Sequence, residues 1–236
     1  MALTIVSFVL LKEIEKGYKI ELKLNSESDF MGQLFTIGHS THDFDYFAAM
    51  LKNNKINYLL DVRSTPYSKY AETYNRENLA ELLEKENITY SYMGKYFGAR
   101  QNDRELYHED GYLDFSKTAR SDFFVKAMKN VMLGLEKGNN IALMCTEKDP
   151  IDCHRAIMVA RAFAVSGVNV NHILADGSLQ NQAELDERLL NMYFPDRAQV
   201  SIFASDNDMT DEEMLKLAYK KRNAQIGYHL EEISDE

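Results

Sequence analysis

Several features that define large protein classes are rare or missing in this sequence. Only two of its 236 residues are cysteines, which is too few for a disulfide framework and favours a reduced, cytoplasmic setting. Only three are prolines, and the chain has no internal repeat or low-complexity tract, which is typical of an ordinary globular domain. The apolar run at residues 4–11 is far shorter than the roughly 20 residues that span a bilayer, and no basic residue precedes it. We therefore predict neither a membrane segment nor a secretory signal.

Positive charge is also in short supply. The chain has 27 Lys and Arg against 37 Asp and Glu, which is a formal net charge of −10. Because nucleic acids and acidic membranes are bound mainly through Lys and Arg, this balance disfavours broad adhesion to either. A local basic cleft is compatible with it, so nucleic acid stays among the open partners.

The common signatures of nucleotide binding and of serine catalysis are absent. The sequence has no G-x-x-x-x-G-K-[ST] loop and no G-x-G-x-x-G turn. Ser40, Ser64 and Ser68 lack a nucleophile-elbow sequence, so a serine hydrolase is disfavoured. The neighbouring aromatic residues are predicted to pack in the core or in a loop rather than to stack on bases: Tyr90, Tyr92, Tyr96 and Phe97.

From residue 34 onward, strand-like and helix-like patterns alternate along the chain. Short apolar runs predict strands at residues 34–37, 56–62, 88–93, 140–145 and 168–174. Helical spacing predicts helices at 43–53, 77–86 and 153–166, with a long helix or a helix pair at 115–137. Such alternation predicts an α/β fold with a mostly parallel sheet and helices on both faces, in three layers. Residues 94–114 lack clear periodicity and are predicted to be a long loop, which in compact domains is usually functional or mobile.

The two ends of the chain differ from this middle part, residues 31–180. Residues 1–30 are predicted to be an appendage without a part in the chemistry, either a hairpin-like pair or a non-native extension, because Met31 precedes the first convincing strand. Residues 181–236 are predicted to be a helical extension that packs on the same domain. Its expected elements are helices at 181–193 and 210–224, an edge strand at 199–203, and cap candidates at 206–208 and Thr210.

Polar residues follow four of the predicted strands. Because ligands bind beyond the carboxyl ends of parallel strands, a site is expected at these positions. They are His39 and Ser40 after the first strand, Asp61, Arg63 and Ser68 after the second, Cys145 and Glu147 after the fourth, and Asp176 after the fifth.

The stretch LMCTEKDPIDCHR, residues 143–155, holds both cysteines. Asp152 is a candidate N-cap, which would place Cys153, His154 and Arg155 in the first turn of a helix. A thiol in that turn has a lowered pKa and is available as a thiolate near neutral pH. Alternatively, the backbone N–H groups of the turn and Arg155 hold a phosphate or carboxylate. A purely structural interpretation has buried thiols and an arginine tied to Asp61 or Glu147.

Other roles for these residues are open. Two thiols and a histidine are plausible zinc ligands, but C-x7-CH lacks compact zinc-knuckle spacing and indicates no fourth ligand, so no metal is predicted. A Cys145–Cys153 disulfide is conceivable, although no C-x-x-C motif supports it. Arg63 is either an anion clamp with Arg155 or half of a salt bridge. His39 is a general base, a hydrogen-bonding orienter or a satisfied turn histidine.

Four segments together resemble a known family: FTIGHST, LLDVRSTPYS, LMCTEKDPIDCHR and HILADG. They are similar to the family called domain of unknown function 488, over about residues 34 to 177, and the tail segment LAYKKRNAQIGY is also similar. The resemblance implies an α/β domain. The residues that correspond to its recurring positions are His39, Ser40, Asp61, Arg63, Pro66, Ser68, Cys145, Glu147, Cys153, His154 and Arg155.

We therefore expect an enzyme that acts on a small anionic or nucleotide-like ligand. Arg63 and Arg155 would bind the anion, assisted by His154, Ser40 and Ser68. Cys153 or Cys145 would be the nucleophile, and His39, Glu147 or Asp61 would move protons. The order of the motifs is loosely similar to rhodanese and cysteine-phosphatase domains, although the spacing from Cys145 to Arg155 departs from C-x5-R.

Two other function classes are open. One is a non-catalytic module that binds a nucleotide, nucleic acid or protein, which needs the arginines but not the thiols. The other is a purely structural role, which predicts ordinary thiol reactivity. The sequence indicates neither a cofactor nor an oligomeric state.

Overall fold

The computed structural model describes residues 32–197 and 209–230 of the chain. The predictions for residues 1–30, the edge strand at 199–203 and the cap candidates at 206–208 therefore lie outside the described residues.

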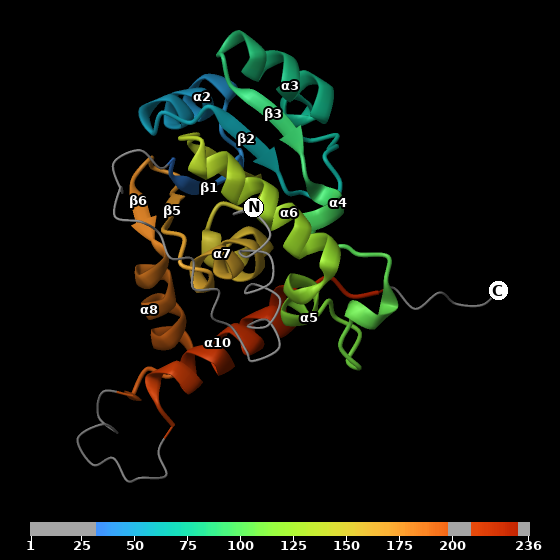
Figure 1. Cartoon of the computed structure of the whole chain (residues 1–236), viewed down its shortest axis with the longest axis vertical. Helices are drawn as coiled ribbons and strands as arrows, with labels where there is room; N and C mark the ends of the chain where they lie inside the picture. Colours follow the sequence, from blue (N-terminus) through green and yellow to red (C-terminus); the bar gives the residue numbers. More distant parts are fainter. Residues whose placement is uncertain (1–31, 198–208, 231–236) are drawn as a thin grey trace, which may run out of the picture.

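A six-stranded sheet forms the centre of the molecule (Figure 1). Its strands are β1 (Leu34–Gly38), β2 (Tyr58–Asp61), β3 (Thr89–Tyr92), β4 (Ile141–Cys145), β5 (Val170–Ile173) and β6 (Leu179–Asn181). They lie in the order β3-β2-β4-β1-β5-β6, and the first five in the chain are parallel to one another. The short polar strand β6 pairs antiparallel with β5 and has no apolar pattern that predicts it. The mostly parallel sheet is thus confirmed.

Helices connect the strands and cover both faces of the sheet. The α-helices are α2 (Phe44–Asn53), α3 (Arg76–Lys85), α4 (Gly94–Phe97), α5 (Phe115–Arg120), α6 (Asp122–Glu136), α7 (Arg161–Val165), α8 (Gln182–Tyr193) and α10 (Asp211–Ile226). The shorter turns are the 3₁₀ segments η1 (Glu72–Tyr74), η2 (Arg104–Leu106) and η3 (Pro150–Asp152), and the π-helix η4 (Arg155–Ala160), which continues into α7. The helix pair predicted at 115–137 is real, because extended backbone at Ser121 separates α5 from α6.

The starts of several helices have side-chain caps of the expected kind. Asp43 caps α2 by accepting from the Tyr46 N–H. Asn181 and Thr210 each form a reciprocal capping box, with Glu184 and Glu213 three residues later. An Asp, Asn or Thr before an apolar-periodic run is therefore the local signal that starts these helices.

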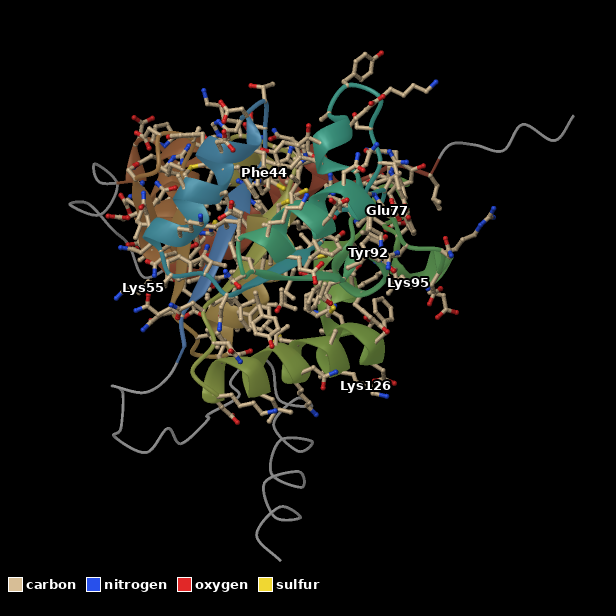
Figure 2. All side chains as sticks on the ribbon, turned by 90° about the horizontal axis from the view of Figure 1, so that it is seen from above. Phe44, Lys55, Glu77, Tyr92, Lys95 and Lys126 are labelled. Carbon is tan, nitrogen blue, oxygen red and sulfur yellow. The ribbon has the colours of Figure 1, made fainter. Side chains whose placement is uncertain are left out.

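Two hydrophobic cores lie on opposite faces of the sheet, because side chains alternate along each strand. Phe35 and Ile37 of β1 pack with α2 and α3, whereas Leu34 faces the core that contains α6 and η4. Figure 2 shows α2, with Phe44 labelled, and α6, with Lys126 labelled, on opposite sides of the strands. The three-layer prediction is confirmed. No helix among residues 32–197 and 209–230 is long and apolar enough to cross a membrane.

The connections that follow β1 and β4 lead toward opposite edges of the sheet. These strands are neighbours, yet β1 leads to β2 on the far side of β4, and β4 leads to β5 on the far side of β1. The loops that follow β1 and β4 therefore leave the sheet in opposite directions. In open parallel sheets, ligands bind at this kind of switch point, beyond the carboxyl ends of the strands.

The segment at 94–114 is more ordered than its sequence suggests. It contains α4 and η2, and Phe97, Tyr107 and Leu113 are buried. The Leu113 N–H donates to the carbonyl of Tyr228, which follows α10. The predicted long loop is therefore right only in part, because it contains two short helical segments and contacts residues after a distant helix that local periodicity does not reveal.

The helices after residue 181 pack on the rest of the fold and reach the cysteine loop. Arg188 of α8 pairs with Asp149 at 2.7 Å. Arg222 of α10 pairs with Asp152 and donates through Nε to the Ile151 carbonyl at 2.9 Å. The C-terminal helices thus hold the outer side of η3, the turn that precedes Cys153.

Candidate functional site

The strand ends at the switch point bring together eight of the ten predicted site residues. In the strand register, Gly38 lies opposite Cys145, and Asp61 lies opposite Met144. Contacts described below join the following residues into one cluster, the strand-end cluster: His39, Asp61, Arg63, Cys145, Glu147, Cys153, His154 and Arg155. Residues more than 100 positions apart in the chain therefore share one rim of the sheet.

Arg63 is buried and forms a two-pronged ion pair with Asp61. Its Nε donates to Asp61 Oδ1 at 2.9 Å, and its Nη2 donates to Asp61 Oδ2 at 2.6 Å. The same Nη2 also donates to the Tyr74 carbonyl at 2.7 Å. Of the two roles considered for Arg63, the salt bridge is the one that the structure contains, and its anion-binding role stays a prediction.

His39 is held between Arg63 and its own turn. Arg63 Nη1 approaches His39 Nε2 at 3.3 Å, and His39 Nδ1 lies 3.1 Å from the Ser40 carbonyl. Because a guanidinium can only donate and a carbonyl can only accept, the proton of a neutral His39 sits on Nδ1. Burial, and then the charge of Arg63, lower the pKa of His39 to about 4. His39 is therefore better suited to orient Arg63 than to act as a general base at neutral pH.

The cysteine loop starts its helix at a different residue from the predicted one. Asp149, not Asp152, caps η3, and Asp152 turns outward to Arg222. Cys153 has extended backbone (φ −131°, ψ 138°), and the continuous helical segment begins at His154. The Arg155 N–H donates to Cys153 Sγ at 3.4 Å, so the thiol itself occupies the capping position. His154 and Arg155 therefore lie in the first helical turn as predicted, whereas Cys153 precedes it, and the predicted cap Asp152 is wrong.

Two sulfurs and one imidazole form the centre of the strand-end cluster. Cys145 Sγ and Cys153 Sγ each lie 3.8 Å from His154 Nδ1. His154 Nε2 lies 3.0 Å from the Val62 carbonyl, so Nε2 carries a proton and Nδ1 faces the sulfurs. Both cysteines are free and buried.

The two thiols have opposite ionisation preferences. Burial, and then hydrogen bonding and charge from Cys153, raise the pKa of Cys145 well above its ordinary value. Burial also opposes ionisation of Cys153, but the hydrogen bond from Cys145 and the charges of Arg155 and His154 outweigh it, so the pKa of Cys153 lies well below its ordinary value. Although burial opposes protonation of His154, the negative charge of Cys153 raises the pKa of His154. The preferred state is a Cys153 thiolate beside a neutral Cys145 thiol.

Glu147 connects this centre to the surface. The residue as a whole is exposed, but its carboxyl group turns back to place Oε2 at 2.8 Å from Cys153 Sγ. Desolvation of that carboxyl, and then the charge of Cys153, raise the pKa of Glu147. A contact between a thiolate and a carboxyl needs one proton between them, and the raised pKa assigns that proton to Glu147.

Arg155 is fully buried. Its Nη1 donates to the Glu147 carbonyl at 2.8 Å, and its Nε has no hydrogen-bond partner among the described residues. Within the described part of the chain, no Asp or Glu forms an ion pair with Arg155. Gly38 permits this packing, because a Cβ there would lie 1.9 Å from the Glu147 carbonyl oxygen.

The two predicted serines are placed differently from the other residues. Ser40 has left-handed backbone (φ 46°), which is rare for a residue with a side chain, and its N–H donates to the Thr146 carbonyl. It therefore borders the cluster through its backbone. Ser68 lies in the loop before η1, where its Oγ accepts from the Tyr70 N–H. No described contact brings Ser68 to the cluster, and its ligand-binding role stays a prediction.

The sulfurs and imidazole are also close enough to hold a metal ion. The ligand atoms of Cys145, Cys153 and His154 all lie within 4.8 Å of one another, and Glu147 Oε2 lies beside Cys153. A soft ion such as Zn²⁺ uses these ligand types, and the His154 contact with a backbone carbonyl is typical of a metal-binding histidine. Glu147 is thus a candidate fourth ligand, which the spacing of the sequence does not indicate.

Four contributing residues carry no clear signal in the sequence. The Tyr74 ring stacks on His39 with centroids 4.2 Å apart, and Tyr90 Oη donates to Asp61 Oδ2 at 2.7 Å. His172 lies buried on β5 with Nδ1 at 2.8 Å from Thr36 Oγ1, and Arg222 holds the cysteine loop from α10. Tyr90 and His172 point inward from predicted strands. Tyr74 and Arg222 meet the cluster only through the tertiary fold.

The fold and the cluster define a class of protein. It is an α/β protein with an open, mostly parallel sheet and a buried centre of two thiols, an imidazole and a guanidinium at the switch point. Residues 43–162, about half of the chain, match the family model described as domain of unknown function DUF488. The chain therefore belongs to the DUF488 family, as its motifs predict. The match includes the cysteine loop, whereas His39 and Ser40 precede it. No curated protein and no solved structure matches the chain.

Two of the buried histidines, His39 and His172, predict a loss of stability in mild acid. Burial, and then the charge of Arg155, lower the pKa of His172 to about 3, and the pKa of His39 is about 4. Below the ordinary histidine pKa, the unfolded chain takes up protons that these folded imidazoles do not. At about pH 5 this difference costs about 2 kcal/mol for each histidine.

Urea unfolding at about pH 7 and about pH 5 measures this effect. In His172→Gln, the drop in the free energy of unfolding between the two pH values is expected to shrink by about 2 kcal/mol. An equal drop in the parent protein and in the variant would contradict the assignment.

Proposed function

We propose that this protein is an enzyme that acts on a small anionic or nucleotide-like ligand, with the Cys153 thiolate as its nucleophile. The observation that carries this proposal is the buried Arg155, whose guanidinium has no carboxylate partner among the described residues. Its charge stabilises the Cys153 thiolate, and its backbone N–H donates to Cys153 Sγ. A buried charge without a counter-charge costs several kcal/mol. The Cys153 thiolate is the group that offsets it. A neutral thiol that is buried only for packing does not need a neighbouring buried positive charge.

The neighbours of Cys153 suit a nucleophilic mechanism. The thiolate attacks an electrophilic atom of the ligand, a bond from sulfur to that atom forms, and the bond to the leaving group breaks. The protonated Glu147 carboxyl gives its proton to the leaving group. Glu147, now a carboxylate, then takes a proton from the water that cleaves the sulfur–ligand bond, which restores the thiolate and the protonated acid.

Several positive groups favour an anionic ligand at this place. The positive charge of Arg155 acts on the thiolate, and His154 becomes positively charged when it binds a second proton. The exposed residues 146–148, including Glu147 and Lys148, lie over this end of β4. A ligand that reaches Cys153 from this side would meet the Glu147 carboxyl, which stays within reach of the leaving group. Asp61, Arg63 and His39 are then positioning residues that hold the β1 and β2 ends.

A pair of alkylating reagents tests the proposal. Iodoacetate and iodoacetamide have similar sizes, but only iodoacetate is negatively charged. Relative to a model thiol such as glutathione, Cys153 is expected to favour iodoacetate over iodoacetamide by about tenfold, because nearby positive charge attracts the anion. Mass spectrometry of peptides locates the modified cysteine, and inorganic phosphate is expected to slow the reaction.

Matched cysteine variants provide the control. Cys145→Ala should keep the fast reaction with iodoacetate, and Cys153→Ala should lose it. Equal preference for the two reagents, or no reaction at Cys153 in the folded protein, would overturn the role of Cys153. Complete alkylation that leaves phosphate binding unchanged would instead support a non-catalytic binding module.

A further inference from the structure

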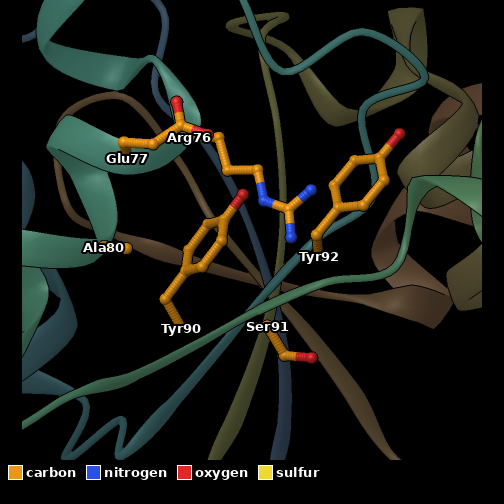
Figure 3. Close-up of a pocket in the computed structure, with 6 residues that line it drawn as sticks. All are labelled: Arg76, Glu77, Ala80, Tyr90, Ser91 and Tyr92. Atoms are coloured by element: carbon orange, nitrogen blue, oxygen red, sulfur yellow. The ribbon is translucent and has the colours of Figure 1, made fainter.

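A hollow opens between α3 and β3, which is an edge strand of the sheet among the described residues. Its volume is about 530 Å³, within the range of small-molecule sites. The residues that line it are Arg76, Glu77, Ala80, Tyr90, Ser91 and Tyr92. Figure 3 shows the Arg76 side chain extending from the start of α3 to place its guanidinium between the rings of Tyr90 and Tyr92. The sequence predicts that these tyrosines pack in the core or in a loop rather than stack on bases, and their half-buried rings share the surface of this hollow.

Arg76 is the positive group of this hollow. Its guanidinium carbon lies 5.0 Å above the centroid of the Tyr92 ring, and the residue is exposed. Within the described residues, no carboxylate forms an ion pair with Arg76. A guanidinium stacked on an aromatic ring keeps its outward N–H groups free for an anion such as phosphate.

Both tyrosines are held rigidly by their hydroxyl groups. Tyr90 Oη donates to Asp61 Oδ2 at 2.7 Å, and Tyr92 Oη donates to the Ser64 carbonyl at 2.9 Å. Their rings are half-buried, stand on the same face of β3 and line the hollow. The Arg76 guanidinium lies between these fixed rings, and a planar group of a ligand can stack beside it on the Tyr90 ring without a further loss of side-chain freedom.

The charges of the hollow define the ligand more closely. Glu77 lies on the same rim, and the Tyr67 hydroxyl donates to its Oε1 at 2.8 Å, which lowers the pKa of Glu77 and keeps it ionised. One guanidinium and one carboxylate accommodate a single phosphate, whereas a triphosphate would meet repulsion from Glu77. The carboxylate can accept hydrogen bonds from an amino group on a base. We infer that this hollow, the β3-edge pocket, binds a nucleoside monophosphate with an amino-bearing base such as adenine.

The β3-edge pocket is linked to the strand-end cluster through Asp61. Tyr90 and Arg63 both donate to Asp61 Oδ2, and Arg63 continues to His39. The inference goes beyond the proposed function, because binding in this pocket uses no thiol. A ligand stacked on the Tyr90 ring would nevertheless contact a residue that donates directly to Asp61, the carboxylate that holds Arg63.

Calorimetric titration with AMP tests the pocket. The parent protein is expected to bind AMP at one saturable site, and adenosine or inorganic phosphate alone is expected to bind at least about tenfold more weakly. UMP, whose base has no amino group, should bind severalfold more weakly than AMP. Arg76→Gln and Tyr92→Leu are each expected to weaken AMP binding by roughly tenfold.

Two control variants test whether AMP binds in this pocket and not elsewhere on the protein. Arg104→Gln removes the same charge from an exposed arginine outside the pocket and should leave AMP affinity within about twofold. Cys153→Ser should also leave it unchanged, so failure of the proposed thiol chemistry would not affect this result. The inference is overturned if AMP does not saturate a site below about 10 mM, or if both pocket variants bind AMP as the parent does.

Discussion

Replacing Cys153 with serine is expected to remove the ultraviolet thiolate absorbance that the folded protein shows at neutral pH. The parent chain should carry one thiolate, because its surroundings hold the pKa of Cys153 well below the ordinary value. The Arg155 N–H and the Arg155 charge both favour the anion, and no other negative partner of Arg155 is present in the described structure. The absorbance should persist as the pH is lowered below neutrality and vanish on acid titration of Cys153.

The second cysteine is the matched control for this measurement. Cys145→Ser should retain most of the thiolate signal, because burial and the neighbouring anion raise the pKa of Cys145 and keep it protonated. In urea, both thiols of the parent should titrate at about pH 8.5, as ordinary cysteines do. A folded protein in which neither thiol ionises below about pH 8 would refute the thiolate assignment.

Metal content decides whether the sulfur is free or coordinated. After dialysis against a chelator, the thiolate signal and the reaction of Cys153 with iodoacetate are expected to be unchanged. Cys145, Cys153 and His154 are close enough to bind one soft ion, but the positive charge of Arg155 opposes a dication at the same place. One tightly held zinc ion per chain would assign the absorbance to a coordinated sulfur and would reject the free nucleophile.

Asp61→Asn is expected to have the largest effect on stability, a loss of about 3–5 kcal/mol in the free energy of unfolding. Asp61 accepts hydrogen bonds from Arg63 Nε, from Arg63 Nη2 and from Tyr90 Oη. Arg63 and Asp61 are 5% and 0% exposed, so the substitution leaves a guanidinium in the interior without its counter-charge. Removing one partner of a buried pair is far more costly than replacing both.

Urea unfolding with two control variants measures the contribution of the buried charge. Tyr90→Phe removes one hydrogen bond to the same carboxylate and is expected to cost about 1 kcal/mol. Glu81→Gln breaks the exposed pair with Lys85 on α3 and is expected to cost less than about 0.5 kcal/mol. If Asp61→Asn is no more destabilising than Glu81→Gln, the Asp61–Arg63 pair does not support the fold as we infer.

Much of the architecture follows from local patterns. The strands at β1, β2 and β4 are buried apolar runs, and α2, α3 and α6 have helical spacing of apolar residues, so their existence and order are readable without the fold. The strand β6 is not readable in this way, because its three residues are polar or exposed and pair only with β5. The segment at 94–114 is also misjudged, since its ordering depends on the end of α10.

The candidate site is likewise predictable from the sequence only in part. Its residue types and their positions after strands predict that His39, Arg63 and the cysteine loop meet at one rim, because parallel strands place their carboxyl ends together. The sequence cannot tell whether Arg63 faces a ligand or Asp61, since both are consistent with an arginine after a strand. Nor can it tell which aspartate caps the turn before Cys153, because Asp149 and Asp152 are both suitable and Arg222 engages Asp152 only through α10.

The sequence by itself determined the alternation of elements, the parallel sheet and the list of reactive side chains. These follow from periodicity and composition over short stretches of chain. Only the tertiary structure decided that two thiols and the His154 imidazole lie within 4.8 Å of one another, that Glu147 turns back onto Cys153, and that Arg155 is buried without a carboxylate partner in the described residues. The physical reason is that ionisation and pairing depend on distance and burial, and these are set by segments that are far apart in the chain.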